Sequence, residues 1–67
     1  MTRIERLAAR LRTLRHARGL TQAQLAAKAG LSREYLARLE TARQAPTLTT
    51  LEKLAKALRV TVADLVR

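Results

Sequence analysis

The chain contains no cysteine, tryptophan or phenylalanine among its 67 residues, and only one proline, one histidine and one tyrosine. Without cysteine, it can form no disulfide framework, thiolate metal site or thiol nucleophile. One histidine and five acidic residues supply little for a catalytic or metal-binding cluster, so we expect neither an enzyme nor a protein with a metal or cofactor. No apolar run approaches the ~20 residues of a membrane span, and no signal peptide is evident, so a soluble, cytoplasmic protein is expected.

Positive charge is what the chain has in excess. The chain has fourteen lysines and arginines but only five acidic residues, which gives a net charge of +9 at pH 7. Such a surface attracts polyanions, so nucleic acid and anionic membranes are the first partners to consider. The apolar content of 48% is too high for a disordered basic tail. It consists mostly of leucine and alanine, which favours an all-α fold, and the length predicts one domain over residues 1–67.

Apolar residues at helical spacing predict a first helix that ends at Gly19, a residue suited to a C-terminal cap. Arg15 lies about 45° from the centre of the apolar stripe. Its guanidinium is therefore either at the edge of the stripe or buried and in need of a carboxylate. The stripe consists of Ile4, Leu7, Ala8, Leu11 and Leu14.

A helix-turn-helix pattern follows. Thr21 and Gln24 form a capping box that predicts a second helix ending at Gly30, and Ser32 is the N-cap of a third. Two short helices joined by a turn of about three residues with a glycine define this motif. Ala26 is small where the two helices cross, and Gly30 accommodates the left-handed backbone of the turn.

Two more helices complete a compact five-helix arrangement. Residues 41–46 contain the only proline and predict a loop, after which a fourth helix begins near Thr47 or Thr49. A capping box of Thr61 and Asp64 predicts a short fifth helix. The apolar side of the fourth helix is expected to contain Leu48, Leu51, Leu54, Ala55 and Leu58.

Many further residues stand at fixed spacing around the helix-turn-helix motif. They are Leu14-Arg15, Gly19-Leu20-Thr21-Gln22, Leu25-Ala26, Gly30-Leu31-Ser32-Arg33, Leu39-Glu40, Pro46-Thr47-Leu48, Leu54-Ala55, Ala57-Leu58, Val60 and Asp64-Leu65. Through these residues the chain resembles, from about residue 5 to residue 66, the lambda-repressor-like (Xre/Cro) helix-turn-helix family. The resemblance implies a sequence-specific DNA-binding transcriptional regulator, in which the third helix enters the major groove of double-stranded DNA. One domain covers only a half-site, so a homodimer on a palindromic operator is expected.

The resemblance also implies roles for individual residues. The recognition helix would present Ser32, Arg33, Glu34, Tyr35 and Arg38 to the major groove. Phosphate or backbone contacts would come from Gln22 at the start of the second helix and from Arg43, Gln44 and Thr47 around the following loop. Arg15 and Glu40 match an ion pair that joins the first helix to the end of the third.

Several of these side chains have alternative interpretations. Arg33 could read guanine through O6 and N7 or simply contact a phosphate. Glu34 and Arg38 have the spacing of a helix-surface ion pair, although Glu34 could also accept from cytosine. Tyr35 could pack on the domain or touch the sugar-phosphate backbone.

The chain departs from the family pattern at Ala42 and Arg59, where the family usually has glycine. If either position requires positive φ, the side chain costs roughly 1 kcal/mol. A small apolar surface near the C-terminus is expected to form the dimer interface. It comprises Val60, Val62, Leu65 and Val66.

Two other functions are alternatives to a DNA-binding regulator. An antitoxin-type interaction module would bind a partner protein as well as its own operator. A cationic membrane-active peptide is disfavoured, because lying on a bilayer does not require five capped segments and a helix-turn-helix pattern.

Overall fold

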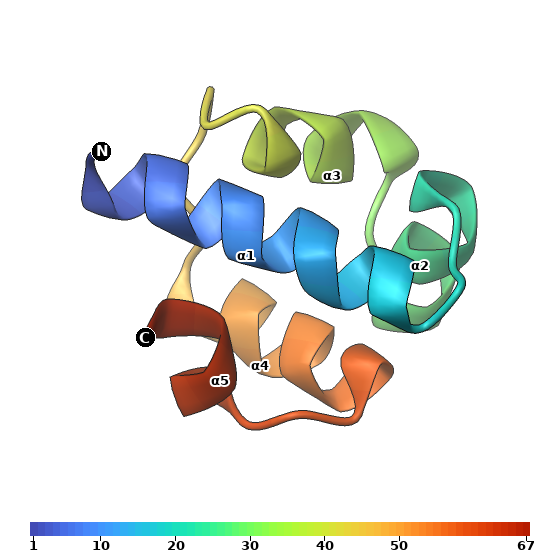
Figure 1. Ribbon diagram of the computed structural model, residues 1–67. Coiled ribbons are helices and arrows are strands. Elements are labelled where there is room, and N and C mark those ends of the chain that lie inside the picture. The colour runs from blue at the N-terminus through green and yellow to red at the C-terminus, as the bar shows by residue number, and fades with distance from the viewer.

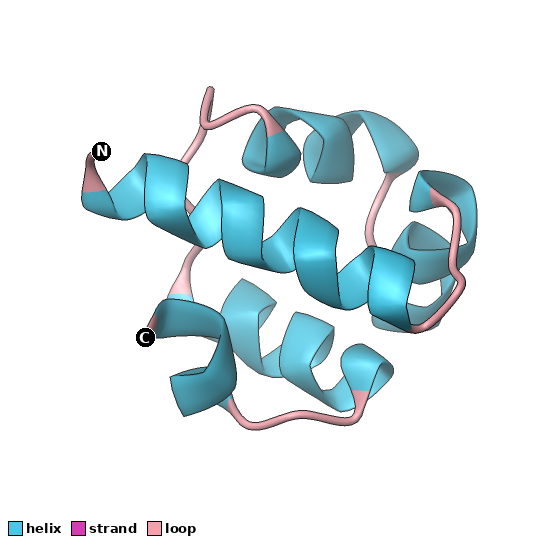
Figure 2. Cartoon of the chain, in the orientation of Figure 1, coloured by secondary structure: helices cyan, strands magenta, loops and turns pink.

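Five α-helices follow one another in the computed structural model, which describes all of residues 1–67 (Figures 1 and 2). There is no strand, so the predicted all-α fold is confirmed. The longest helix, α1, crosses the molecule with α3 on one side and α4 and α5 on the other (Figure 1). The bounds are α1 Arg3–Ala17, α2 Gln22–Ala29, α3 Arg33–Glu40, α4 Leu48–Leu58 and α5 Val62–Val66.

Every helix begins after a threonine or serine whose hydroxyl accepts a hydrogen bond from an amide of the first turn. This contact satisfies one of the amides that a helix start leaves without a partner. The starts predicted at Thr21, Ser32 and Thr61 are confirmed, and α4 begins after Thr47 rather than Thr49. The cap at Thr2, which forms a capping box with Glu5, was not predicted.

The carboxylates of two capping boxes titrate abnormally. The backbone amide of Thr2 donates to Glu5 and lowers its pKa, and the amide of Thr61 does the same to the pKa of Asp64. Because the pKa of each carboxylate is lower in the folded state, its contribution to the stability of the folded protein is complete above its pKa in the unfolded chain, which is about 4. It is lost as the pH falls through the lower folded values, so these helix starts are fully capped at neutral pH.

Four helices end in the same left-handed turn. The residues with positive φ are Gly19 (68°), Gly30 (69°), Ala42 (59°) and Arg59 (57°). After each, the next amide donates to a carbonyl five residues back, for example from Arg43 to Arg38 at 2.9 Å, which is the Schellman pattern. Both departures from the family's glycines therefore occur where the backbone is left-handed.

Leucine and alanine alone make up the buried core. Leu65 is fully buried in it, because α5 packs against both α1 and α4. This corrects the expectation that Leu65 belongs to a dimer surface. Leu48 is 65% exposed instead of buried, since it is the first residue of α4 and precedes the packed turns. The core residues are Leu11, Leu25, Ala26, Ala29, Leu36, Leu39, Leu54, Ala55, Leu58 and Leu65.

None of the five helices is long and apolar enough to cross a membrane. The longest, α1, has 15 residues and contains five arginines among them.

We expect Ala42→Gly to raise the free energy of unfolding by up to about 1 kcal/mol, because glycine adopts positive φ without strain from a Cβ. Ala45→Gly is the matched control, since Ala45 lies in the same loop at negative φ and glycine there only increases the entropy of the unfolded chain. Urea unfolding of both variants measures the difference. Equal changes in the two variants would show that position 42 is not strained.

Candidate nucleic-acid interface

The outer face of α3 is an exposed polar surface of the helix-turn-helix. Arg33, Glu34 and Arg38 are exposed, whereas Leu36 and Leu39 are buried beneath them. The Ser32 hydroxyl accepts from the Tyr35 amide at 3.0 Å and begins the helix. The eight-residue helix thus fixes three long polar side chains on a rigid element that is anchored by leucines.

A buried ion pair fixes the end of this helix. The Arg15 guanidinium donates to both carboxylate oxygens of Glu40, from Nε to Oε2 at 2.7 Å and from Nη2 to Oε1 at 3.0 Å. Arg15 is 8% exposed and Glu40 only 1%. A third Arg15 nitrogen, Nη1, donates to the Leu20 carbonyl at 2.9 Å. Arg15 is therefore a buried residue of α1 whose carboxylate partner is Glu40 of α3.

Gln22 connects the ion pair to the exposed face of α3. Its Nε2 donates to Glu40 Oε1 at 3.1 Å, and its Oε1 accepts from Arg33 Nη1 at 3.4 Å. Both ends of the Gln22 amide are thus engaged within the protein, although the resemblance implies a phosphate contact for it. The second contact places the Arg33 guanidinium beside Gln22, the first residue of α2.

A second set of contacts links α3 to the loop and to α4. Arg38 Nε donates to Gln44 Oε1 at 2.9 Å, and the Arg38 guanidinium carbon lies 5.8 Å from the centre of the Tyr35 ring. The Tyr35 hydroxyl shares a 3.2 Å hydrogen bond with Thr50, which also accepts from Thr47 at 3.1 Å. Of the two interpretations of Tyr35, the structure shows the packed one.

Two ion pairs are present, Arg15–Glu40 and the exposed Arg67–Asp64. The surface pair between Glu34 and Arg38 is therefore not formed, because the Arg38 side chain turns toward Gln44. Glu34 remains exposed.

The remaining predicted contact residues lie beside α3 in the chain and at the surface. Arg43 and Gln44 are exposed in the loop after α3, and Thr47 is exposed as the N-cap of α4. The structure also adds Thr50, a buried hydroxyl that joins Tyr35 to Thr47. No sequence signal singled out Thr50, because it lies inside α4 among apolar positions.

Arginines of α1 and of its C-cap form contacts that the sequence did not reveal. Arg10 Nε donates to the Asp64 carbonyl at 2.8 Å and Arg18 Nε to the Leu58 carbonyl at 2.8 Å, and Arg12 donates to the Glu40 carbonyl. These carbonyls lie in the last turns of α5, α4 and α3, where a helix has no amide to offer them. The acceptors are backbone atoms, so residue types and spacing carried no signal for these contacts.

The turn at Gly30 joins two short helices, and the second of them exposes arginines while Leu36 and Leu39 on its other side are buried. This arrangement defines a helix-turn-helix domain of the DNA-binding class. Residues 11–65 match the HTH_3 helix-turn-helix family. The chain belongs to this family, to which the Xre and lambda-repressor-like proteins also belong.

Relatives with known names support this membership. The immunity repressor protein of Bacillus phage phi105 is 51% identical over 57 residues, which cover 85% of this chain and 40% of the repressor. The uncharacterized HTH-type transcriptional regulator y4dJ of Sinorhizobium fredii is 47% identical over 53 residues, which are 79% of this chain and 69% of y4dJ. The chain thus spans two-fifths of the phage protein and about two-thirds of y4dJ.

Solved structures share the whole fold. The restriction-modification controller protein C.AhdI from Aeromonas hydrophila superposes with a TM-score of 0.91 at 37% identity, over 92% of this chain and 94% of the controller. The biofilm master regulator SinR, solved in complex with DNA, gives a TM-score of 0.88 at 32% identity, over 91% of this chain and 98% of SinR.

We expect Glu40→Ala to lower the free energy of unfolding by about 3–5 kcal/mol, because it leaves the Arg15 guanidinium buried without its counter-charge. Denaturant unfolding followed by circular dichroism measures the loss. Glu34→Ala is the matched control: it removes the exposed carboxylate of the same helix and should change stability by less than about 0.5 kcal/mol. Similar losses in the two variants would contradict a structural role for the buried pair.

Proposed function

We propose that the chain is a sequence-specific DNA-binding domain that regulates transcription, with α3 in the major groove of its operator. The observation that carries the proposal is the set of long polar side chains on α3, which stand on a helix fixed by the buried Arg15–Glu40 pair. A phage immunity repressor among the relatives, and a related regulator solved with DNA, support the same conclusion.

In this proposal Arg33 reads a base. It lies in the first turn of α3, and a guanidinium donates two parallel hydrogen bonds to O6 and N7 of guanine. Gln22 holds Arg33 only through a long 3.4 Å contact, which leaves the guanidinium free to turn to a base edge. Glu34 and Arg38 flank it on the exposed face of the same helix.

Phosphate contacts would supply most of the affinity and set the orientation of α3. Arg43 and Thr47 are exposed in the segment that follows α3, and the Ser32 hydroxyl lies at its start. Their placement before and after α3 suits contacts with the backbones on either side of the groove. Such binding weakens steeply as salt rises, because each phosphate contact releases condensed counterions.

We further propose a homodimer, since one such domain covers a half-site and paired half-sites lie about 34 Å apart or at a multiple of that spacing. With Leu65 buried, the surface consists of Val60, Val62 and Val66, and Val66 is 52% exposed. Val66 borders an apolar cleft of about 360 Å³, which Leu7 and Leu51 also line. The surface is small, so the dimer should be weak in the absence of DNA.

Selection of bound duplexes from a random DNA pool tests the proposed function. A recurring motif with two-fold symmetry supports a sequence-reading dimer, and a recurring motif without symmetry supports a reading monomer. Recovery of no motif, with binding that depends on salt alone, would contradict sequence-specific recognition.

Arg33→Ala should weaken binding to the selected site by about 1–3 kcal/mol and relax the preference at one base pair, because a bidentate base contact is lost. Binding to random DNA should change far less. Fluorescence anisotropy with both duplexes measures the ratio, and Lys53→Ala is the control that removes one charge outside the predicted contact residues. Equal weakening on the two duplexes would make Arg33 a phosphate contact.

Val66→Glu should abolish cooperative binding to a two-half-site duplex, because it places two carboxylates in one apolar interface. Val62→Glu should act in the same way, but Val62 is packed against the core, so thermal unfolding must show that this variant is folded. Gel shifts on one-site and two-site duplexes measure the cooperativity. Unchanged cooperativity in a folded Val66→Glu variant would place the interface elsewhere.

A further inference from the structure

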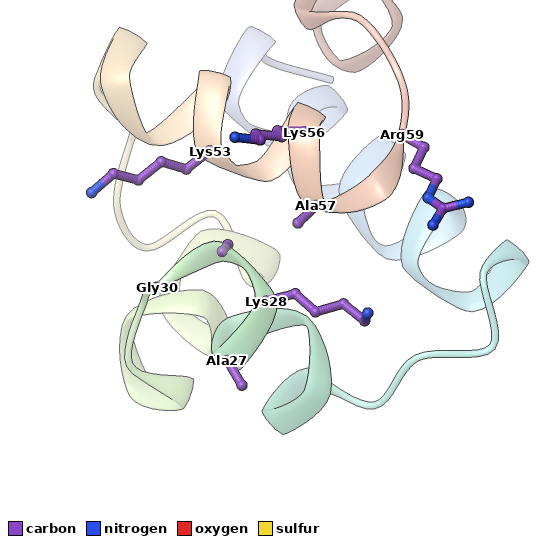
Figure 3. Close-up of a pocket in the computed structure, with 8 residues that line it drawn as sticks. Ala27, Lys28, Gly30, Lys53, Lys56, Ala57 and Arg59 are labelled. Carbon is purple, nitrogen blue, oxygen red and sulfur yellow. The ribbon is translucent and has the colours of Figure 1, made fainter.

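A second positively charged surface lies between α2 and α4, and none of the residues that line it is predicted to touch DNA. It is a cleft of about 570 Å³ that we call the lysine cleft (Figure 3). Its charged lining consists of Lys28, Lys53, Lys56 and Arg59, with no acidic residue. The lining includes all three lysines of the chain, whereas every predicted DNA-contacting cation is an arginine. The two surfaces therefore differ in side-chain chemistry as well as in position.

The four cations form no ion pair within the protein, although Glu52 lies in α4 beside Lys53 and four residues before Lys56. The two ion pairs of the protein involve other residues, and all four side chains are exposed. Lys28 and Lys56 lie in the last turns of α2 and α4, where they offset the negative ends of the helix dipoles. Lys53 lies a full turn earlier in α4, so dipole compensation does not account for it.

Arg59 provides an independent reason to look for a ligand. Its φ of 57° is a conformation in which glycine would be less strained, yet the position carries an unpaired cation at the edge of the cleft. By contrast, Arg10, Arg12 and Arg18 each donate to a backbone carbonyl near a helix end, as Arg18 does to Leu58. A side chain kept in a strained conformation without an intramolecular partner points to a role outside the fold.

The arrangement of the charges determines the class of ligand. Figure 3 shows the charged ends spread apart around the gap between α2 and α4 instead of converging on one point. Such a spread suits an extended polyanion better than a single small anion. A second copy of this chain offers no matching acidic segment, because its five acidic residues are scattered along the sequence.

The floor of the cleft favours a polypeptide over a nucleic acid. Between the cations the lining contains the exposed Ala27 and the half-buried Ala57, whose methyl groups are available for apolar contact, whereas Ala29 is buried and Gly30 has no side chain. The apolar side chains of a peptide gain from contact with methyl groups, whereas a sugar-phosphate edge offers little to them. The only aromatic residue, Tyr35, packs elsewhere against α4, so the cleft has no aromatic ring on which a base could stack.

We propose that the lysine cleft docks an acidic, amphipathic segment of a partner protein, while α3 remains free to hold DNA. Its carboxylates would pair with the lysines and Arg59, and its apolar residues would lie on the alanine floor. None of the lining residues is among the predicted DNA contacts, so the two ligands would use different side chains. The cleft would thereby attach a partner to a DNA-bound regulator.

Two matched triple variants test the proposal. Lys28→Gln, Lys53→Gln and Lys56→Gln together remove three charges from the cleft, and Arg33→Gln, Arg38→Gln and Arg43→Gln remove three from the DNA side. The probe is a fluorescent peptide of repeated Glu-Glu-Ala-Leu units, and a peptide of Gln-Gln-Ala-Leu units is the neutral control. Anisotropy is measured on the free protein and on the protein saturated with its selected duplex. Circular dichroism melting verifies that both variants are folded.

We expect the lysine variant to bind the acidic peptide about tenfold more weakly, with its operator affinity largely retained. The arginine variant should show the opposite, with peptide binding retained and operator binding lost. Equal loss of peptide binding in both variants would show only attraction to net charge and would overturn the proposal. It would also be overturned if the wild-type protein bound the acidic peptide no better than the neutral peptide. Loss of binding to a second DNA duplex in the lysine variant would overturn it as well, because the cleft would then be a DNA-binding surface.

Peptide binding by the free protein is independent of the proposed function. If no DNA sequence is ever selected but the lysine variant still loses the peptide, the proposed function fails and the cleft proposal stands. If a DNA sequence is selected but the lysine variant binds the peptide as well as the wild-type protein does, the proposed function stands and the cleft proposal fails.

Discussion

The carboxylate of Glu40 is the contact on which the rest of the helix-turn-helix depends. It accepts from Arg15 of α1 and from Gln22 of α2, and the carbonyl of the same residue accepts from Arg12. A buried carboxylate is tolerated only when it is paired and hydrogen-bonded, so the three helices must meet at this point. The exposed face of α3 is thereby oriented from its buried end, and Gln22 extends the same network to Arg33.

The charge of +9 is divided among three uses. Arg10 and Arg12 of α1, and Arg18 at its C-cap, donate to carbonyls at the ends of other helices. The arginines of α3 and its loop form the proposed DNA surface, and the lysines gather in a separate cleft. Arginine serves where a directed hydrogen bond is needed, and lysine where only charge is displayed.

Local signals explain what the sequence could predict. A capping hydroxyl acts within one turn, so the starts at Thr21, Ser32 and Thr61 follow from residue type alone. The burial of Leu65 depends on how a five-residue helix packs against α1, which spacing does not encode. Likewise, Gln22 appears as a phosphate contact in the family pattern, but its bridging role depends on where α3 brings Glu40 and Arg33.

Titration of the isotopically labelled protein with its selected duplex, followed by amide chemical shifts, tests whether α3 and the loop after it are the face that binds DNA. The account predicts that the largest shifts fall on residues 32–38 and 43–47, with small shifts at α5 and the lysine cleft. A scrambled duplex should perturb residues 43–47 but leave the first turn of α3 nearly unchanged. Shifts centred on α5 or on the lysine cleft would contradict the account, because DNA would then be bound by a different face.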